Sequence, residues 1–349
     1  MNKLTLETIA NKLRHIVRKV VYAKKRLHYY MFVWYVDHVN HPYATLIEKL
    51  LPRDKEAFWN KEGDFIVPRF WIDDLINEIQ KESVLLKECR IRKTNADYFV
   101  EPVLNNSGNN TVRIETQDFH TLVAAPRGKI SNKNILRTAA IAIARRIDTD
   151  MLRLKESDIR VSSIKSIFLH PEVNKKQTVD AKDETGSYLV SFHGTEDALI
   201  DVDTWKNATF SLPVRYRRNK KWYMNHETGN YVSQIYDPAT DWSDDNPELD
   251  EICYLIDHER DVDEDRRPIN IIGSPIIYTP TMAKGNIIAM LTDLSRTYAM
   301  VFGVNASISL DKENSNWLLR NSVGGNVVDP TGIRIVRSGV TQIEQTDLA

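Results

Sequence analysis

The sequence predicts an α+β fold, arranged as two domains or as one elongated fold, and three observations lead to this prediction. The chain has 349 residues, more than a typical single domain contains. Apolar residues recur at helical spacing in several segments of its first half, whereas the region from about residue 269 onward shows short apolar runs typical of strands. Between two of the helices lies a stretch with the pattern of a long β-hairpin.

Composition and charge narrow the class of protein. Hydrophobic residues make up 42% and charged residues 27%, which is typical of a soluble chain, and a formal net charge of -1 argues against a protein that mainly coats nucleic acid. The two cysteines, Cys89 and Cys253, are too few for a disulfide framework or a cysteine-rich zinc site, and they suit a reducing cytoplasm. No signal peptide is expected, and the apolar run at residues 30–35 is far shorter than the roughly 20 residues of a membrane span. We therefore expect no association with a membrane.

Residues 1–60 predict a helical N-terminal arm. The apolar residues that form its stripe are Leu6, Ile9, Leu13, Ile16, Val17 and Val20. The basic residues that lie between and after them are Arg14, Arg18, Lys19, Lys25 and Arg26. Two interpretations stay open: an arm that contacts DNA or another protein, or a solvated face on a helix that packs against a neighbour.

The hairpin lies between two predicted helices. The first helix opens at Val67-Pro68 and ends near Leu86. Alternating strands at 97–101 and 111–115 follow, joined by the polar turn-forming residues 105–110. Because the strands carry few apolar residues, we expect the hairpin to bury little within its own subunit and to lie on a partner.

The next elements are predicted by the same patterns. A long helix runs from Ser131 to Leu154, and a further helical stretch from Trp205 to Tyr216 is kinked or divided by Pro213. A strand at 222–224 and a short helix at 228–235 follow. The last predicted strands lie at 271–272, 276–277, 287–291, 298–302 and 327–328. Gly324-Gly325 is interpreted as a turn.

Residues 237–265 form a strongly acidic segment, interpreted as a surface loop. Asp261, Asp263 and Asp265 alternate as in a calcium-binding loop. The positions where that loop needs a glycine and a bidentate glutamate hold Arg266 and Ile272, so a calcium hand is not predicted. Acids crowded at a symmetry axis could still collect cations weakly.

No other motif indicates chemistry. The chain lacks a glycine-rich nucleotide loop, a nucleophile elbow and a zinc-protease helix, and no Cys or carboxylate pattern supports His38 and His41 as metal ligands. We therefore predict no catalytic residues, no cofactor-binding residues, no metal ligands and no cofactor, in a protein that is not an enzyme.

Four segments carry a resemblance to a known family. Residues 212–228 contain Tyr216-Arg217-Arg218-Asn219 and Trp222-Tyr223-Met224-Asn225, and three further motifs are Gly273–Ile277, Leu291–Tyr298 and Arg320–Pro330. In this order they resemble the Tyr-Arg-x-Asn-Ala-like, Trp-x-Met-Asn-like, Gly-x-Pro-Val, Gly-Asp-Leu-x-x-x-Tyr and Arg-x-Gly-Gly-x-Val-x-Asp-Pro patterns of tailed-phage major capsid proteins with the Hong Kong 97-type fold. The resemblance covers about residues 61 to 340.

The resemblance implies a division into domains. Residues 1–60 would be the N-terminal arm or a short scaffolding segment, and residues 97–126 the extended hairpin loop that lies across a neighbouring subunit. The segments that would form the peripheral domain, with the long helix as its spine, are 61–96, 127–188 and 301–340. Residues 189–300 would form the axial domain, including the acidic loop 237–265, and 341–349 a C-terminal tail.

The resemblance also implies a function. The chain would be a major capsid protein that self-assembles into hexamers and pentamers, forming an icosahedral head around the double-stranded DNA of a tailed virus. Its implied partners are copies of itself, a portal protein, a scaffolding protein or maturation protease, decoration proteins and non-specifically contacted DNA. The implied location is the virion, with assembly in the host cytoplasm. Cross-linking through the hairpin is not predicted, because no lysine lies between Asp97 and Phe119.

Three alternatives remain open at this point. One is an encapsulin-like compartment shell, which would hold an enzyme cargo in place of DNA. A second, from a different class, is a hydrolase whose site is assembled in space. The third is another virion component, such as a tail or scaffolding protein, against which the ordered C-terminal motifs argue. Relatives that lose an N-terminal segment to a protease also leave open whether residues 1–60 are retained.

Overall fold

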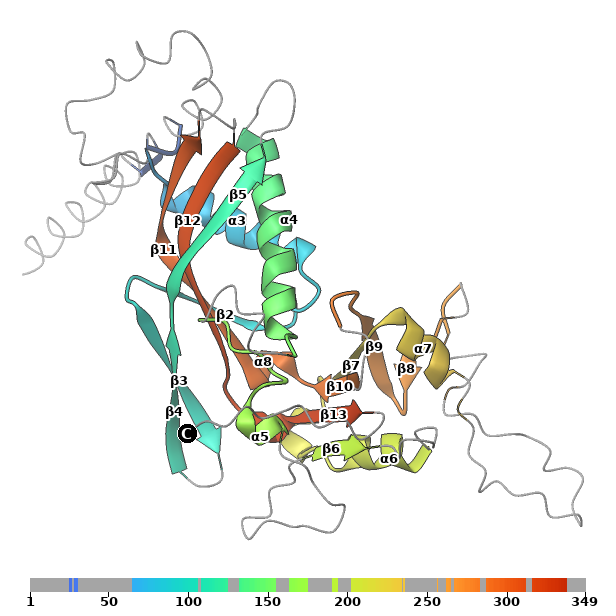
Figure 1. Cartoon of the computed structure of the whole chain (residues 1–349). Coiled ribbons are helices and arrows are strands. Elements are labelled where there is room, and N and C mark those ends of the chain that lie inside the picture. The colour runs from blue at the N-terminus through green and yellow to red at the C-terminus, as the bar shows by residue number, and fades with distance from the viewer. Residues whose placement is uncertain are drawn as a thin grey trace, which may run out of the picture. The chain divides into compact units, whose positions relative to one another are not determined.

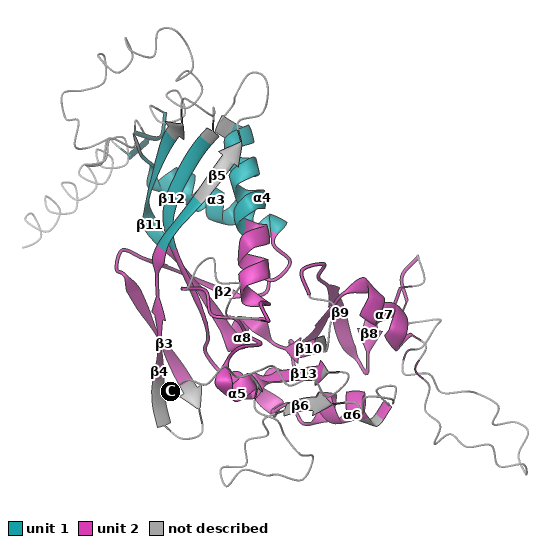
Figure 2. Cartoon of the chain, in the orientation of Figure 1, with its two compact units in different colours: residues 1–82, 118–143, 303–322 teal, residues 83–117, 144–302, 323–349 magenta. Residues whose placement is uncertain are grey.

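The computed structural model divides the chain into two compact units (Figure 2). It describes residues 25–26, 28–30, 65–105, 108–124, 132–154, 163–174, 190–193, 202–233, 235, 256, 262–264, 267–282, 287–311 and 316–337. Unit 1 comprises residues 1–82, 118–143 and 303–322, and unit 2 comprises residues 83–117, 144–302 and 323–349. Three long elements run through both units: helix α4 (Asn132–Met151) and strands β11 (Tyr298–Asp311) and β12 (Asn316–Val327).

Unit 1 contains helix α3 (Arg69–Glu82) and most of a five-stranded sheet. The strand order is β1 (Phe65–Ile66), β11, β12 and β5 (Gln117–Ala124), with β2 (Arg90–Thr94) also paired to β11. Helix α3 buries one face, formed by Trp71, Ile72, Leu75, Ile76 and Ile79. This is the apolar stripe that predicted the helix, and the prediction is confirmed with an end four residues before Leu86.

Helix α4 confirms the predicted long helix, with bounds slightly inside Ser131 to Leu154. Its fully buried positions recur every three to four residues: Ile135, Ala139, Ala140, Ile143, Ala144, Ile147 and Met151. Three of these positions are alanines, while Arg137 and Arg145 stay exposed on the opposite side.

Only a small part of the predicted N-terminal arm is described, namely residues 25, 26 and 28–30, and these are helical. The ring of Tyr29 meets Phe70 of α3 edge to face, with centroids 6.3 Å apart. Burial, and then the charge of Asp74, raises the pKa of Tyr29. The remaining positions of the predicted arm, including His38 and His41, lie outside the described residues.

Unit 2 is built on a six-stranded mixed sheet (Figure 1). Its order is β6 (Val190–His193), β13 (Ile333–Arg337), β10 (Ile287–Thr292), β7 (Lys221–Met224), β9 (Ser274–Tyr278) and β8 (Asn270–Ile271). The β13–β6 and β7–β9 pairs are parallel and the other pairs antiparallel. Trp205 of helix α6 (Val202–Phe210) packs on Trp222 of β7 at a centroid distance of 4.9 Å, at the centre of the core.

The position of β13 differs from the expected domain division. Residues 301–340 were assigned together to a peripheral domain, but β13 pairs with β10 and β6 in the sheet of unit 2. The pairing is long-range: Thr292 opposes Ile333 and Val336 opposes Ala289. Local sequence pattern cannot specify such a partner, because the apolar residues of β13 would suit either sheet.

Two predictions about glycine-containing segments are wrong. Gly324-Gly325 is not a turn but lies inside β12, where a Cβ on Gly324 would stand 2.1 Å from the carbonyl oxygen of Glu115. The predicted strand 271–272 ends at Ile271, because Ile272 (φ 47°) and Gly273 (φ 66°) form the two-residue turn between β8 and β9. Both central residues have positive φ, as a type I′ turn requires.

The other predictions for this region are mostly confirmed. Pro213 does divide the predicted 205–216 stretch, into α6 and a 3-10 turn, η3 (Val214–Tyr216). The short helix is α7 (His226–Val232), which begins two residues earlier than predicted and is capped by the side chain of Asn225. Within the described residues, no helix combines the length and apolar character needed to cross a membrane.

Candidate assembly surfaces

Two of the sequence motifs meet at a buried carboxylate, that of Asp329. Arg215 donates from Nη2 to Asp329 Oδ2 over 2.9 Å, and the Tyr216 hydroxyl donates to the same oxygen. Asp329 also accepts from the backbone N–H of Thr331, which caps the 3-10 turn η4 (Pro330–Gly332). Burial, and then the hydrogen bond to Asp329, raises the pKa of Tyr216 to about 12, so the phenol stays protonated as a donor.

A third motif joins the same cluster through helix α8 (Leu294–Thr297). Asp293 caps this helix by accepting from Ser295 N at 3.1 Å, and Arg296 donates to the carbonyl oxygen of Arg215 at 3.2 Å. A Cβ on Gly332 would lie 2.5 Å from Thr297 and 2.8 Å from Tyr216, so glycine permits this close approach. We call Arg215, Tyr216, Asp293, Thr297 and Asp329 the motif cluster.

The motif cluster has a structural role. It ties together the connections between α6 and β7, between β10 and β11, and between β12 and β13. The carboxylate of Asp329 is bound by an arginine, a tyrosine and a helix cap, so it is not placed to act as a general base. Sequence analysis connected these segments only through their order along the chain; the structure brings them into contact.

Sequence reasoning missed one buried residue beside the cluster, Arg334 of β13. Its side chain is fully buried and donates to Ser211 Oγ, Ser211 O, Thr331 O and Ile333 O at 2.7–3.0 Å. Burial lowers the pKa of Arg334 to about 10, which leaves the guanidinium charged at neutral pH. The four acceptors satisfy this charge and join the end of α6 to β13. Arginine in an apolar strand segment gives no sequence signal of burial.

The predicted hairpin is formed by β3 (Tyr98–Asn105) and β4 (Gly108–Glu115). Pairing runs from Tyr98 opposite Glu115 to Asn105 opposite Gly108, so the tip is shorter than the predicted 105–110. The expectation that the hairpin buries little in its own subunit is wrong for one face: Val103 and Ile114 pack with Ala299, Val301 and Val328. Tyr98 (45% exposed) and Val100 (44%) stay open to solvent.

The base of the hairpin is anchored by Glu101, which is only 1% exposed. Its carboxylate accepts from Arg90 at 2.5 Å and from Arg92 at 3.0 Å, both on β2. Burial acts to raise the pKa of Glu101, but the hydrogen bonds and charges of Arg92 and Arg90 outweigh it and lower the pKa below its usual value. This paired carboxylate ties β3 of the hairpin to β2.

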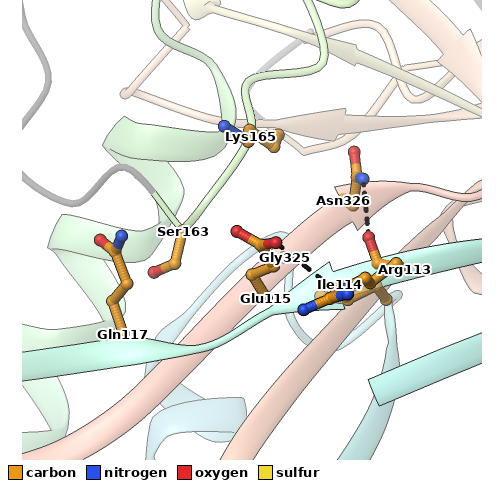
Figure 3. A pocket seen from close by; sticks show the side chains of 8 residues that line it. All are labelled: Arg113, Ile114, Glu115, Gln117, Ser163, Lys165, Gly325 and Asn326. Carbon is orange, nitrogen blue, oxygen red and sulfur yellow. Dashed lines mark hydrogen bonds and ion pairs between the residues drawn. The ribbon is translucent and has the colours of Figure 1, made fainter. Parts of the chain in front are cut away.

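A polar pocket of about 290 Å³ lies where the hairpin meets β5 and β12 (Figure 3). Its lining residues are Arg113, Ile114, Glu115, Gln117, Ser163, Lys165, Gly325 and Asn326. Arg113 and Glu115 form an ion pair at 3.6 Å, and Asn326 donates to the carbonyl oxygen of Arg113. Ser163 donates to Val323 O, and none of the lining residues is a histidine.

The acidic positions singled out in the sequence are only partly described. Asp261 and Asp265 lie outside the described residues, whereas both carboxylate oxygens of Asp263 accept from Arg267 at 2.8 Å. Within the described residues, no group of three or more His, Cys, Asp and Glu side chains could hold a metal ion. Cys89 is buried, and burial raises the pKa of its thiol; Cys253 is not among the described residues.

Comparison with known proteins gives similarity in structure only. The sequence matches no protein-family model, and no curated protein matches it. A capsid chain of the native GTA particle is 14% identical with a TM-score of 0.50, and the match covers 74% of this chain and 97% of that one.

Two further solved structures are a chain of Gordonia phage Cozz and the SrpI encapsulin of Synechococcus elongatus. The phage chain is 13% identical, with 85% of this chain and 94% of that one covered at a TM-score of 0.43. The encapsulin is 8% identical, with 72% and 86% covered at a TM-score of 0.44. On the strength of the GTA match, the chain has the fold of that capsid chain, which confirms the Hong Kong 97-type fold predicted from the motifs.

Proposed function

We propose that this chain is the major capsid protein of a tailed double-stranded DNA virus, assembling into the hexamers and pentamers of an icosahedral head. The observation that carries the proposal is the fold: the match spans nearly the whole length of the GTA capsid chain. Fold alone does not imply function, so the assembly surfaces have to support it as well.

The hairpin supports the proposal because its two faces differ. One face packs into its own unit through Val103 and Ile114, and the other exposes Tyr98 and Val100. The guanidinium of Arg113 lies 4.3 Å from the centroid of the Tyr98 ring, which holds this exposed aromatic side chain in place. In the proposed shell this face lies on a neighbouring subunit.

The proposed roles of the segments follow the expected division, with one change. Residues 61–96, 127–188 and most of 301–340 act as the peripheral domain and 189–300 as the axial domain, which β13 joins through its pairing with β10. Residues 1–60 act as the arm or scaffolding segment. The proposed partners are further copies, a portal protein, scaffolding or protease proteins, decoration proteins and packaged DNA. The protein acts in the virion after assembly in the host cytoplasm.

A structural role, not catalysis, is proposed for the motif cluster. Its buried carboxylate Asp329 is committed to Arg215, Tyr216 and the cap of η4, and these contacts hold three connections of unit 2 in place. A shell subunit needs such rigidity, because small angular errors at each contact prevent a closed assembly.

The test is negative-stain electron microscopy of the chain expressed alone, together with light scattering. Rings, tubes or closed shells are expected, and DNA protected from nuclease inside particles made during infection would separate a phage head from a cargo compartment. A chain that stays monomeric even with scaffolding protein and crowding agents would contradict the proposal and favour a search for a hydrolase site.

A further inference from the structure

The connection between α6 and β7 in unit 2 presents an unusual surface. Phe210 is 61% exposed and Val214 is 76% exposed, the two highest values among the large hydrophobic side chains that the structure describes. They lie four residues apart, at the end of α6 and the start of η3. Arg217 holds this connection by donating to the carbonyl oxygens of Phe210 and Leu212, both at 2.8 Å.

The same surface is strongly basic. From Thr204 to His226 the sequence contains six basic residues and no Asp or Glu. Arg215 forms an ion pair with Asp329, and Lys221 forms one with Glu88 at 2.7 Å. Arg217, whose described partners are backbone carbonyls, keeps its charge uncompensated by a carboxylate there. We call Phe210, Val214, Arg217, Arg218 and Lys220 the basic face.

Like charges are crowded on the basic face. Arg218 is exposed, and Lys220 is half-buried. Burial, and then the positive charge of Arg217, lowers the pKa of Lys220. A carboxylate placed against this surface would relieve that repulsion, so the favoured partner is anionic and carries apolar side chains for Phe210 and Val214.

The chain contains a segment of that chemistry. Residues 237–265 hold thirteen acidic residues and one arginine, so their formal charge is 1 − 13 = −12, in a chain whose net charge is only −1. Apolar residues are interspersed among the acids, including Trp242, Leu249 and Ile252. Tryptophan is among the residues that contribute most to protein interfaces.

We propose that the basic face binds the acidic segment 237–265 of an adjacent copy of this chain, an inference that rests on the proposed function. The six-stranded sheet supplies the reason for an adjacent copy. Helix α6 lies against β6 and β13 at one edge of the sheet, whereas α7 and β8 lie at the other (Figure 1). The described residues that flank the acidic segment are at this second edge: Ile235 follows α7, and Val262 bridges to Pro268 before β8.

This arrangement is compatible with a ring of identical subunits. In a heterologous contact, one surface of each copy meets a different surface of the next, so a donor segment and an acceptor face on different parts of the subunit can close the ring. A segment of this length can also extend across about 24 Å, the width of six strands, and reach the basic face of its own chain. The experiment therefore has to separate a contact between chains from one within a chain.

The experiment uses charge reversal in the full-length chain. One variant carries Arg218→Glu and Lys220→Glu, a second carries Asp244→Lys and Asp245→Lys, and a third carries all four changes. Arg217 is left intact because it holds the end of α6. The matched control is Lys133→Glu with Arg137→Glu, which makes the same charge change at exposed positions of α4. Assembly is measured by light scattering and electron microscopy at low and high salt.

We expect each two-site variant to assemble less well than the wild type, and we expect assembly to recover when the two variants are mixed. Each variant alone should need about ten-fold more protein to assemble, because two charges that attracted the neighbouring copy then repel it at every contact. In a six-membered ring the two variants can alternate, so that each reversed basic face meets a reversed acidic segment. An equimolar mixture should therefore recover the formation of hexamers. The four-site variant should also assemble, and the control should match the wild type.

Three outcomes would overturn the inference. If both two-site variants assemble as well as the wild type, the proposed contact does not exist. As long as the wild-type chain itself forms shells, that result does not affect the proposed function. Rescue in the four-site variant without rescue on mixing would place the contact within one chain. Normal shells that package less DNA in the Arg218→Glu, Lys220→Glu variant would show that the basic face binds nucleic acid. If the wild type forms no assembly even with scaffolding protein and crowding agents, the proposed function fails and the inference with it.

Discussion

Gly324 is a position where a single methyl group should be costly. A Cβ there would lie 2.1 Å from the carbonyl oxygen of Glu115 and 3.3 Å from the Cα of Thr116, so both obstructing atoms belong to backbone. Gly324→Ala should therefore lower the free energy of unfolding by about 1–3 kcal/mol or more, because neighbouring strands must separate. Urea denaturation measures this change.

Gly273→Asn is the matched control for this substitution. A Cβ on Gly273 would have no atom within 4 Å of it, and asparagine tolerates the φ of 66° found at this position. The control should stay within about 0.5 kcal/mol of the wild type. Equal stability of Gly324→Ala and the wild type would show that the two strands can move apart without loss.

Asp148 makes stability depend on pH. It is 5% exposed and accepts hydrogen bonds from Ser83 Oγ and from Val84 N at 3.2 Å. Burial, the largest effect, raises its pKa to about 6, above the value of roughly 3.9 expected in the unfolded chain. The folded state therefore takes up the proton first, and the contribution of Asp148 to stability rises as pH falls from 7 toward 4.

The size of this effect is bounded by the two pKa values. A difference of about two units corresponds to at most about 3 kcal/mol. Urea unfolding at pH 7.5, 6 and 5 should show this gain in the wild type and its loss in Asp148→Asn. Asp118→Asn, at an exposed position, should retain the wild-type profile. An Asp148→Asn variant with an unchanged pH profile would mean that the carboxyl is solvated in the folded protein.

At the scale of secondary-structure elements, the motif cluster joins three connections through Asp329. Asp329→Ala removes the cap of η4 and leaves Arg215 and Tyr216 without their acceptor, which should cost about 3–5 kcal/mol. Tyr216→Phe removes one hydrogen bond and should cost about 1–2 kcal/mol. Since both changes break the same contact, the double variant should be less destabilised than the sum of the two. Additive losses in urea denaturation would show that Tyr216 and Asp329 do not interact.

Elements whose apolar residues recur at a regular spacing were predictable from the sequence. Elements that are defined by pairing with distant segments were not. The stripes of α3 and α4 specify helices without reference to the rest of the chain. In contrast, the sheet to which β13 belongs depends on its pairing with β10, and the glycines of β12 are explained only by Glu115, Tyr298 and Met300 crossing nearby. For the hairpin, local Asn and Gly content predicted a long loop, but cross-strand pairing extends to Asn105.

For the candidate surfaces too, the residues could be identified from local sequence, but their distant contacts could not. The residues of the motif cluster were present in the quoted motifs, but their contacts could not be deduced from order alone. Arg334 gave no signal, because a buried arginine is satisfied by carbonyl groups that the fold supplies. The opposite charges of the basic face and the acidic segment are visible in the sequence, whereas the strands of unit 2 next to which they lie are not.

At the scale of the whole molecule, substitutions in the hairpin can distinguish the stability of the subunit from the assembly of the shell. Its exposed face, Tyr98 and Val100, contributes little to the core of its own unit. Tyr98→Asp with Val100→Asp should therefore lower the free energy of unfolding of the monomer by only about 1 kcal/mol, through loss of the contact with Arg113 and a new aspartate opposite Glu115. In a shell, the same face would be buried against a neighbour, and two carboxylates there would be desolvated without partners. Assembly should therefore fall by about ten-fold or more in the particle yield measured by light scattering.

Val103→Asp on the buried face of the same hairpin supplies the contrasting variant. Val103 is 7% exposed and packs with Ile114, Ala299 and Val301, so a carboxylate there should destabilise the subunit by about 2–4 kcal/mol before any assembly begins. The two variants place the same chemistry on opposite faces of one arm, and only the exposed-face variant should yield a folded subunit that fails to assemble. If that variant forms normal shells, the hairpin does not contact a neighbour through Tyr98 and Val100, and assembly must depend on other surfaces, such as the basic face.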